Sequence, residues 1–243
     1  MIPYSQIDAV LLDAGNTLVS MDLAWIRSVL AELGLQARLA EIRRAEAAAR
    51  VELSRLVEAG AGTEGPDSFE AYLGALLRRL DPQAPAHLSR ELARRLRPGN
   101  GARELWSQVL PGVREALERI GSLGLKRIVV SNSDGGVEAR LARVGLAPLL
   151  EGVIDSQRLG VEKPDPAIFV HALRAAGTRP ERSLHVGDLL SVDVRGAQQA
   201  GIHALLLDPY GDWQGADCER APDLDEVSRR LAAALGDRRP ETP

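Results

Sequence analysis

The chain has 243 residues and a mass of 26.1 kDa, and 45% of its residues are apolar and 26% are charged. A chain of this length and composition can bury enough apolar surface to fold without disulfides or structural metals, which excludes disordered, collagen-like and mini-protein classes. The net charge of -4 and the 3% of aromatic residues provide neither a basic surface for phosphate backbones nor stacking platforms for bases. We therefore expect no nucleic-acid partner.

The compartment is predicted from the cysteine content and the N-terminal residues. The single cysteine, Cys218, cannot form an internal disulfide, and the N-terminus lacks the basic flank and long apolar core of a secretion signal. No uncharged apolar run approaches the length that crosses a bilayer. We expect a cytoplasmic protein with no membrane association, and the oligomeric state stays open.

Short apolar runs that end in polar residues recur along the chain. They are continuous in Val, Ile and Leu, which is typical of strands buried on both faces of a sheet. Helical patterns separate the later runs, and this alternation predicts a doubly wound, parallel α/β sheet with right-handed crossovers. The predicted strands cover residues 9–13, 127–131, 152–155, 183–188 and 203–208.

Residues 21–106 interrupt this alternation, because they show helical periods and no strand-like run. Four apolar stripes there predict four amphipathic helices. The simplest architecture is a core at residues 1–19 and 106–243, interrupted after its first strand by an all-helical unit at residues 20–105.

Helix-breaking residues predict the loops of the helical unit, and the chain ends in a polar tail. The tail predicts one last helix at residues 224–235, followed by a frayed end. The predicted loops cover residues 60–66, 81–82 and 97–101.

Polar residues follow the predicted strands at the edge where parallel sheets bind ligands, beyond the carboxyl ends of the strands. Asp13 follows the first strand, and Ser131 and Asn132 stand at the end of the second. A hydroxyl, an amide and free main-chain N–H groups before a helix can hold an oxyanion. Each of these signals, taken singly, is also typical of an ordinary turn.

Lysine is rare in this chain, because only Lys126 and Lys163 interrupt an otherwise all-arginine set of basic residues. Asp165 and Pro166 predict the capped start of a helix, but they leave Lys163 unexplained. An ammonium group can approach a carboxylate and a phosphate together, whereas a guanidinium imposes a planar fork. We therefore interpret Lys163 as a site residue, whereas Lys126 needs no role beyond a solvated surface.

Asp188 ends a predicted strand, and Asp193 lies five residues later at the start of a helical pattern. Two such carboxylates can converge on one hard cation such as Mg²⁺, or they can be a turn Asp and a first-turn helix Asp. The topology brings Asp13, Ser131, Lys163 and Asp188 to one rim of the sheet, and this conjunction favours a shared site. The interpretation requires that the side chains share one cavity.

Taken together, the motifs resemble those of the haloacid dehalogenase superfamily over nearly the whole chain. The helical unit resembles the C1 cap of that superfamily, so the resemblance implies a Rossmann-like core with a helical cap. Four motifs carry the likeness: Asp13, Gly15 and Thr17 stand at its Asp-x-Asp-x-Thr positions, Ser131 at its second motif, Lys163 at its third, and Asp188 and Asp193 at its Gly-Asp-x-x-x-x-Asp motif.

The resemblance implies a Mg²⁺-dependent phosphatase that hydrolyses a small phosphorylated metabolite through an aspartyl-phosphate at Asp13, with Lys163 as a second catalytic residue. It implies that the metal is held by Asp13, the main-chain carbonyl of Gly15 and Asp188, with Asp193 in or behind that set of ligands. The phosphate-binding residues that it implies are Thr17, Ser131, Asn132 and Lys163.

Glycine at position 15 departs from the pattern, because the superfamily's phosphatases usually carry there an aspartate that protonates the leaving group. Loss of a positioned acid or base costs roughly 10²- to 10⁴-fold in rate. Several alternatives stay open: a stand-in such as Asp134 or a cap residue; a leaving group that is a weak base, as in acyl or aryl phosphates; or an impaired relative that binds phosphate or a protein partner. Halide displacement is less favoured, because it needs no cation and the Asp188 and Asp193 pair is retained.

The sequence leaves the substrate open. We expect the arginines of the helical unit to form a solvated face by default, and we assign no role to the histidines. These residues are Arg38, Arg43, Arg44, Arg50, Arg55, Arg78 and Arg79, and His87, His171, His185 and His203.

Overall fold

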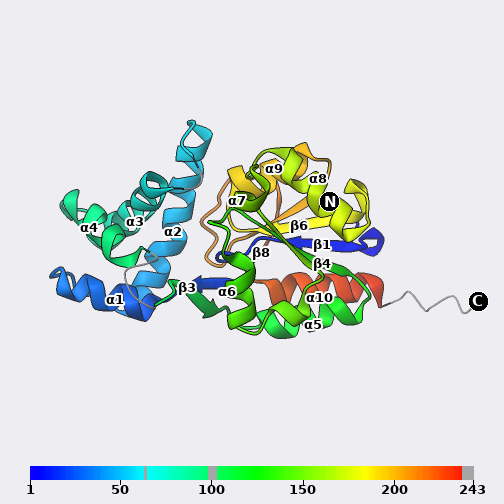
Figure 1. Cartoon of the computed structure of the whole chain (residues 1–243), viewed down its shortest axis with the longest axis horizontal. Helices are drawn as coiled ribbons and strands as arrows, with labels where there is room; N and C mark the ends of the chain where they lie inside the picture. The colour runs from blue at the N-terminus through cyan, green and yellow to red at the C-terminus, as the bar shows by residue number, and fades with distance from the viewer. Residues whose placement is uncertain (63–64, 98–102, 237–243) are drawn as a thin grey trace, which may run out of the picture.

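The computed structural model describes residues 1–62, 65–97 and 103–236. A helical unit stands beside a sheet flanked by helices, and the two lie along the long axis of the molecule (Figure 1). Parts of the predicted loops, residues 63–64 and 98–101, and the predicted frayed end at 237–243 lie outside the described residues.

The sheet confirms the predicted doubly wound, parallel α/β class. Within the described residues it has six parallel strands in the order β5-β4-β1-β6-β7-β8, so the first strand of the chain lies in the middle. All residues of the central strands are buried, as their continuous apolar runs predict. The strands are β1 (Ala9–Leu12), β4 (Lys126–Ser131), β5 (Gly152–Asp155), β6 (Ser183–Gly187), β7 (His203–Leu207) and β8 (Glu219–Ala221).

Helices cover both faces of the sheet. Successive side chains of β1 point to opposite faces, so they pack against both layers of helices. Val10 and Leu12 pack against α5, α6 and α10, whereas Ala9 and Leu11 pack against α8 and α9. Figure 1 shows the two helical layers above and below the sheet. The helices are α5 (Val113–Ser122), α6 (Val137–Arg143), α7 (Ser156–Leu159), α8 (Pro166–Ala176), α9 (Arg195–Gln199) and α10 (Leu224–Leu235).

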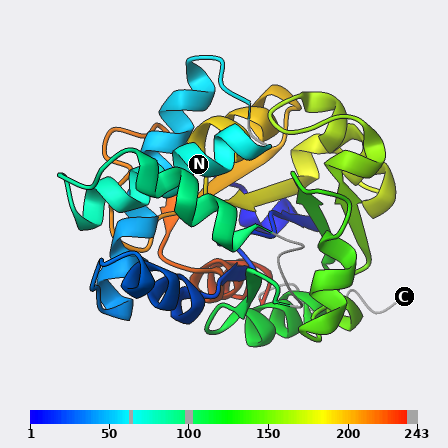
Figure 2. The ribbon, with the colours of Figure 1, turned by 60° about the vertical axis from the view of Figure 1, so that its left-hand side comes forward.

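The helical unit has its own core, built from the apolar stripes of its helices. Asp22 caps the first helix by accepting a hydrogen bond from the main-chain N–H of Trp25, and Pro66 begins the third. When the left-hand side of the molecule is turned forward, this unit lies in front of the sheet (Figure 2). Its helices are α1 (Leu23–Glu32), α2 (Leu39–Glu58), α3 (Pro66–Leu80) and α4 (His87–Leu96).

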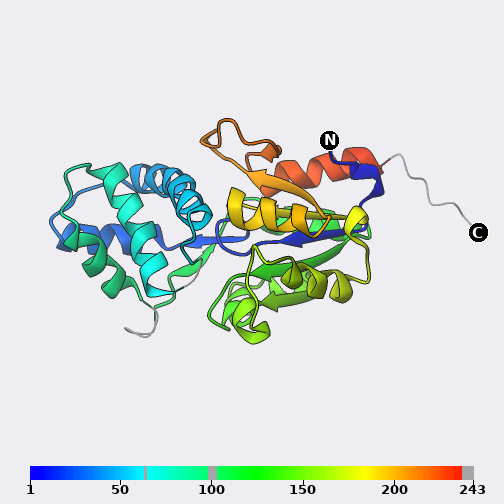
Figure 3. The same ribbon diagram turned by 90° about the horizontal axis from the view of Figure 1, so that it is seen from above.

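The prediction that residues 21–106 hold no strand is wrong at both edges. β2 (Val19–Met21) and β3 (Trp106–Val109) pair antiparallel and carry the chain out to the helical unit and back. These strands, like β8, were missed because each has only three or four residues and no continuous apolar run. Figure 3 shows this narrow connection from above. The predicted domain boundaries fall at this ribbon and stay a prediction.

The remaining helical segments are single turns. They are η1 (Tyr4–Gln6), η2 (Ala147–Leu149), η3 (Pro180–Arg182) and a π-type turn, η4 (Leu190–Val194), which precedes α9. In the part of the chain that the structure describes, no helix combines the length and the apolar character needed to cross a membrane.

Candidate active site

The strand register brings the predicted residues to one edge of the sheet. Leu12 of β1 pairs with Val129 of β4 on one side and with Val186 of β6 on the other. Because parallel strands end at the same edge, Asp13 lies beside the ends of β4 and β6, where Ser131 and Asp188 stand. The register thus brings Asp13, Ser131 and Asp188 to one edge of the sheet.

Lys163 is the centre of the arrangement. Its Nζ donates to Oδ1 of Asp13 at 2.6 Å and to Oδ1 of Asp193 at 2.8 Å, and all three side chains are buried. Burial opposes the charge of the ammonium, but the carboxylates of Asp13 and Asp193 outweigh it and raise the pKa of Lys163. Lys163 is therefore a buried cation at neutral pH.

Asn132 fixes the main chain at Lys163. Its Oδ1 accepts from the Lys163 main-chain N–H and its Nδ2 donates to the Lys163 carbonyl, both at 2.8 Å. The side chain thus positions the main chain at Lys163. The Ser131 hydroxyl is buried beside it at the end of β4.

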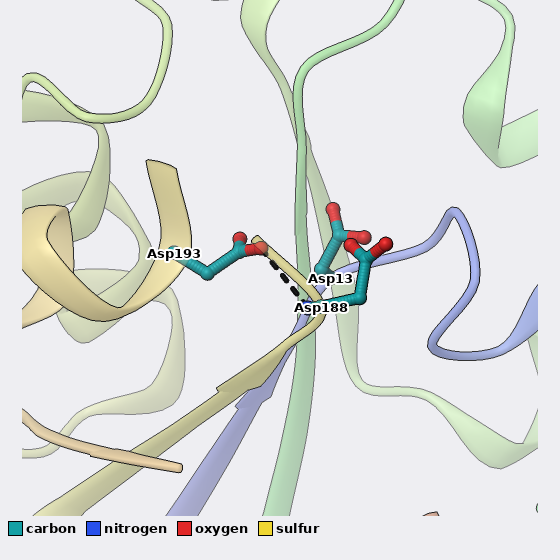
Figure 4. A group of neighbouring side chains, drawn as sticks. All are labelled: Asp13, Asp188 and Asp193. Atoms are coloured by element: carbon teal, nitrogen blue, oxygen red, sulfur yellow. Dashed lines mark hydrogen bonds between the residues drawn. The ribbon is translucent and has the colours of Figure 1, made fainter. Parts of the chain in front are cut away.

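Asp193 supports the site from the π-type turn η4. Its Oδ2 accepts the main-chain N–H groups of Asp188 and Leu189 at 3.1 and 3.0 Å, while its Oδ1 contacts Lys163. This close approach requires glycine at 187, because a Cβ there would lie 2.2 Å from the Asp193 carboxyl carbon. Figure 4 shows the carboxylate pointing toward the Asp188 main chain.

His185 was assigned no role from the sequence, but the structure places it behind Asp193. Its Nε2 lies 3.1 Å from Oδ1 of Asp193, and the ring is fully buried against Phe169. Burial opposes ionisation of Asp193, but Lys163 and His185 outweigh it and hold the pKa of that carboxyl well below its usual range. A polar residue inside an apolar strand was the signal in the sequence.

Asp13 and Asp188 form the acidic part of the site, and their carboxylates lie side by side (Figure 4). Each of Asp13, Asp188 and Asp193 offers an oxygen within 4.8 Å of the others, and this is a potential metal cluster. Burial raises the pKa of Asp13 against the effect of Lys163, and it raises the pKa of Asp188 well above its usual range against the effect of Arg50. The positive charges of Lys163 and Arg50 therefore do not fully offset the effect of burial, which disfavours the ionised form of these two carboxyls.

Two buried polar atoms beside Asp13 have no hydrogen-bond partner among the described residues. They are Oγ1 of Thr17 and Oδ1 of Asn16. Buried polar atoms are nearly always paired in folded proteins, so these two atoms are candidates for contact with a bound group. The Asn16 Nδ2, by contrast, contacts the Tyr72 hydroxyl at 3.2 Å and Oδ2 of Asp188 at 3.3 Å.

The helical unit contributes a buried polar cluster that the sequence analysis missed. Arg50 is not solvated as expected: its guanidinium binds both carboxylate oxygens of Glu46 and lies 3.5 Å from Oδ2 of Asp188. The Tyr72 hydroxyl also donates to Glu46, and burial raises the pKa of this phenol well above its usual range. The signal was the spacing of Glu46, Arg50 and Ser54, which lie four residues apart beside an apolar stripe.

Asp134, a possible stand-in for the acid missing at Gly15, is paired with Arg140. Both carboxylate oxygens accept from the guanidinium at 2.6 Å. Chiefly this hydrogen bond lowers the pKa of Asp134 against the opposing effect of burial. The group is therefore ionised at neutral pH and has no proton to give.

A cavity of about 420 Å³ is lined both by polar residues of the site and by apolar residues of the core and of the helical unit. This volume is in the range of small-molecule sites. Its polar lining includes Asp13, Lys163 and Asp188, and its apolar lining consists mainly of Val19, Leu53, Phe69, Leu105, Trp106, Val137 and Leu141.

Comparisons with known proteins agree with this geometry. A family model described as haloacid dehalogenase-like hydrolase matches residues 7–201. The haloacid dehalogenase-like hydrolase domain-containing protein 3 of Danio rerio is 32% identical over 208 residues, covering 82% of this chain and 85% of that protein. A glyceraldehyde 3-phosphate phosphatase of Methanopyrus kandleri is 33% identical over 122 residues, covering 49% of this chain and 52% of that protein.

A solved structure shares this fold. The HAD-hydrolase YfnB of Bacillus subtilis superposes with a TM-score of 0.64 at 18% identity, covering 93% of this chain and 98% of that chain. The chain spans 40% to 60% of the length of several other curated relatives. Because the family model covers most of the sequence and its motifs meet at one site, the chain belongs to the haloacid dehalogenase-like hydrolase family.

Proposed function

We propose that this protein is a Mg²⁺-dependent phosphatase that hydrolyses a small phosphorylated metabolite, with Asp13 as the nucleophile. The observation that carries the proposal is the buried Lys163 ammonium, which is held between Asp13 and Asp193 beside the carboxylate of Asp188. The similarity to a protein named as a phosphatase supports the same class of reaction.

The donor atoms fit a hard divalent cation. Mg²⁺ prefers oxygen ligands, and the carboxylates of Asp13 and Asp188 with the main-chain carbonyl of Gly15 would supply them. When bound, Mg²⁺ would neutralise the phosphate oxygens and the charge that burial disfavours on the two carboxylates. Because both oxygens of Asp193 are engaged, we assign it the positioning of Lys163 and of the Asp188 main chain.

The reaction would proceed in two displacements. A carboxylate oxygen of Asp13 attacks phosphorus while the bond to the leaving-group oxygen breaks, and water then attacks phosphorus and restores the carboxylate. Lys163 orients Asp13 and neutralises charge on the transferring group, whereas the hydroxyls of Ser131 and Thr17 donate to its oxygens. Removal of one such donor typically costs about 3 kcal/mol of transition-state stabilisation.

No carboxylic acid takes the place of the aspartate missing at Gly15 in this proposal. Asp134 is ionised and paired with Arg140, and Glu46 accepts hydrogen bonds from Arg50 and Tyr72. We therefore expect the leaving group to depart without a proton from a carboxyl, so that kcat/KM falls steeply as the pKa of the leaving group rises.

Phosphate release tests the proposal. Phenyl phosphate, acetyl phosphate and glyceraldehyde 3-phosphate are incubated with the protein in MgCl₂ or in EDTA, and at least one ester should be turned over only with Mg²⁺. In water and methanol mixtures, the ratio of inorganic phosphate to methyl phosphate should be the same for all turned-over substrates, because they share one phosphoenzyme. Equal phosphate release in EDTA would show that the metal has no part in the reaction.

The metal itself should stabilise the fold. Burial raises the pKa of Asp13 and Asp188 above the values of the unfolded chain. The free energy of unfolding of the metal-free protein therefore falls as pH rises from the unfolded-chain pKa of each carboxyl to its pKa in the folded protein. Saturating Mg²⁺ adds about 2.7 kcal/mol at a hundredfold excess over Kd, which raises Tm by roughly 5 to 10 °C. We expect a larger rise in Tm at about pH 8 than at about pH 5.

Calorimetry of the Asp188→Asn variant checks the origin of this stabilisation. The variant should lose most of the Mg²⁺-dependent rise in Tm, because it lacks one of the two carboxylate ligands. An unchanged rise would place the ion elsewhere on the protein.

One alternative function has an observation in its favour. Gly15 would suit an impaired relative that binds phosphate without hydrolysing its esters, and binding of inorganic phosphate with no ester turnover would support that function. Halide release from a 2-haloacid in EDTA would instead support displacement at carbon, a reaction that needs no cation.

A further inference from the structure

The space beside Gly15 is filled by an aromatic ring. A Cβ at Gly15 would lie 3.3 Å from the Trp106 ring, and its three nearest neighbours are all ring atoms of that tryptophan. The turn does not itself require glycine here, because the left-handed residue is Asn16, with a φ of 53°. The indole of Trp106 thus occupies the side of the turn where a side chain at 15 would begin.

The rest of the cavity extends this aromatic wall. Phe69 and Leu53 enter from the helical unit, and Val137 and Leu141 enter from α6, so apolar groups from both units face the same space. Of the three arginines that line the cavity, Arg50 is paired with Glu46 and Arg140 with Asp134 and Glu104, and the third, Arg97, is an exposed residue at the end of α4. The space beside Trp106 is therefore suited to an apolar group.

We infer that the substrate is an aryl phosphate, whose ring packs on Trp106 and whose phosphate faces Asp13 and Lys163. The inference rests on the proposed phosphatase reaction and names its substrate class. It joins two observations that are otherwise unrelated. Gly15 supplies no proton to the leaving group, and the Trp106 ring forms an apolar wall of the cavity beside Gly15.

An aryl leaving group makes the missing acid unnecessary. Asp13 forms a bond to phosphorus, the ring oxygen departs with the electron pair as a phenolate, and water then releases inorganic phosphate from Asp13. The proton that this water loses goes to the phenolate, so the products are a phenol and hydrogen phosphate. A phenol has a pKa of about 10, as the tyrosine side chain does, whereas an alkoxide is a base comparable to hydroxide, whose conjugate acid has a pKa of about 15.7.

Leaving-group chemistry is tested with two esters that both contain a ring. Phenyl phosphate releases a phenolate, whereas benzyl phosphate releases an alkoxide. With Mg²⁺ present, we expect kcat/KM for phenyl phosphate to exceed that for benzyl phosphate by roughly 10²- to 10⁴-fold. Values within about threefold of each other would overturn the inference and leave the phosphatase proposal intact, whereas no release from any ester would overturn the phosphatase proposal itself.

Ring recognition is tested by inhibition, which involves no leaving group. Phenylphosphonate should inhibit with a Ki about two- to tenfold lower than that of cyclohexylphosphonate. Contact between two aromatic rings adds binding free energy of this size beyond the burial of apolar area. In Trp106→Leu the two Ki values should converge, with no change in the Ki of methylphosphonate. Trp25→Leu is the matched control, because Trp25 lies in the helical unit and does not line the cavity.

A second variant keeps the inference testable if Trp106→Leu does not fold. Gly15→Asp introduces a carboxyl and needs the Trp106 ring to move by a few tenths of an ångström. It should raise kcat/KM for benzyl phosphate at least about tenfold and leave that for phenyl phosphate unchanged or lower. Equal acceleration of both esters would overturn the inference.

The cavity also selects the size of the substrate. Its volume of about 420 Å³ fits a small molecule under the helical unit. Phenyl phosphate should therefore be hydrolysed at least about tenfold faster than a tyrosine-phosphorylated peptide, and the reverse order would show that the aryl phosphate belongs to a protein.

Discussion

Replacing Lys163 by methionine is expected to destabilise the fold by about 3 to 5 kcal/mol and to reduce phosphatase turnover by about 10²-fold or more. Methionine keeps the unbranched shape but leaves the carboxylates of Asp13 and Asp193 buried without their shared cation. Loss of one partner of a buried ion pair is costly because the remaining charge stays desolvated. Urea unfolding and phosphate release measure the two effects.

The only other lysine provides the control. Lys126→Met removes an exposed ammonium at the start of β4, and we expect a change in stability within about 0.5 kcal/mol. The cost of Lys163→Met should grow as pH rises, because removal of the ammonium raises the pKa of the buried Asp13 and Asp193 carboxyls in the folded variant, so that they lose their protons at a higher pH than in the unfolded chain. A cost that does not change with pH would show that Lys163 stabilises the fold by packing alone.

Changing Asp13 to asparagine should reduce kcat by about 10⁴-fold or more, because an amide cannot form the phosphoenzyme. The fold should survive, since Lys163 keeps its ion pair with Asp193 and one buried carboxyl with a raised pKa is removed. Single-turnover phosphate release and urea unfolding, measured on the same preparation, separate the loss of chemistry from a loss of folded protein.

Asp223→Asn is the matched control for this change. Asp223 caps α10 by accepting from the Glu226 main chain at 2.8 Å, and asparagine caps helices about as well as aspartate. Its kcat should stay within about twofold of the parent protein. If Asp13→Asn retained most of the parent turnover, the nucleophile would have to be another group.

Much of the fold could be predicted because its elements carry local signals. The central strands are continuous apolar runs, and α8 begins at Pro166 with Asp165 as its cap, as expected. The ribbon of β2 and β3 carries no such signal, since its pairing depends on residues that lie far apart in the chain. The stability of such short strands comes from their partners, so a local pattern does not reveal them.

The meeting of Asp13, Ser131 and Asp188 could also be predicted, because parallel strands end at one edge and so bring their terminal residues together. What the sequence by itself determined is therefore the order of these groups around the sheet. It also placed a glycine at position 15, close to Asp13 in the chain and directly before Asn16.

Only the tertiary structure decided what surrounds those groups. Arg50 reaches Asp188 from a separate helical unit, His185 backs Asp193, and the Trp106 ring covers Gly15. Periodicity predicts which face of a helix or strand is buried but not which surface it meets. That choice depends on how two independently packed units fit together around one cavity, which is a property of the whole chain and not of any segment.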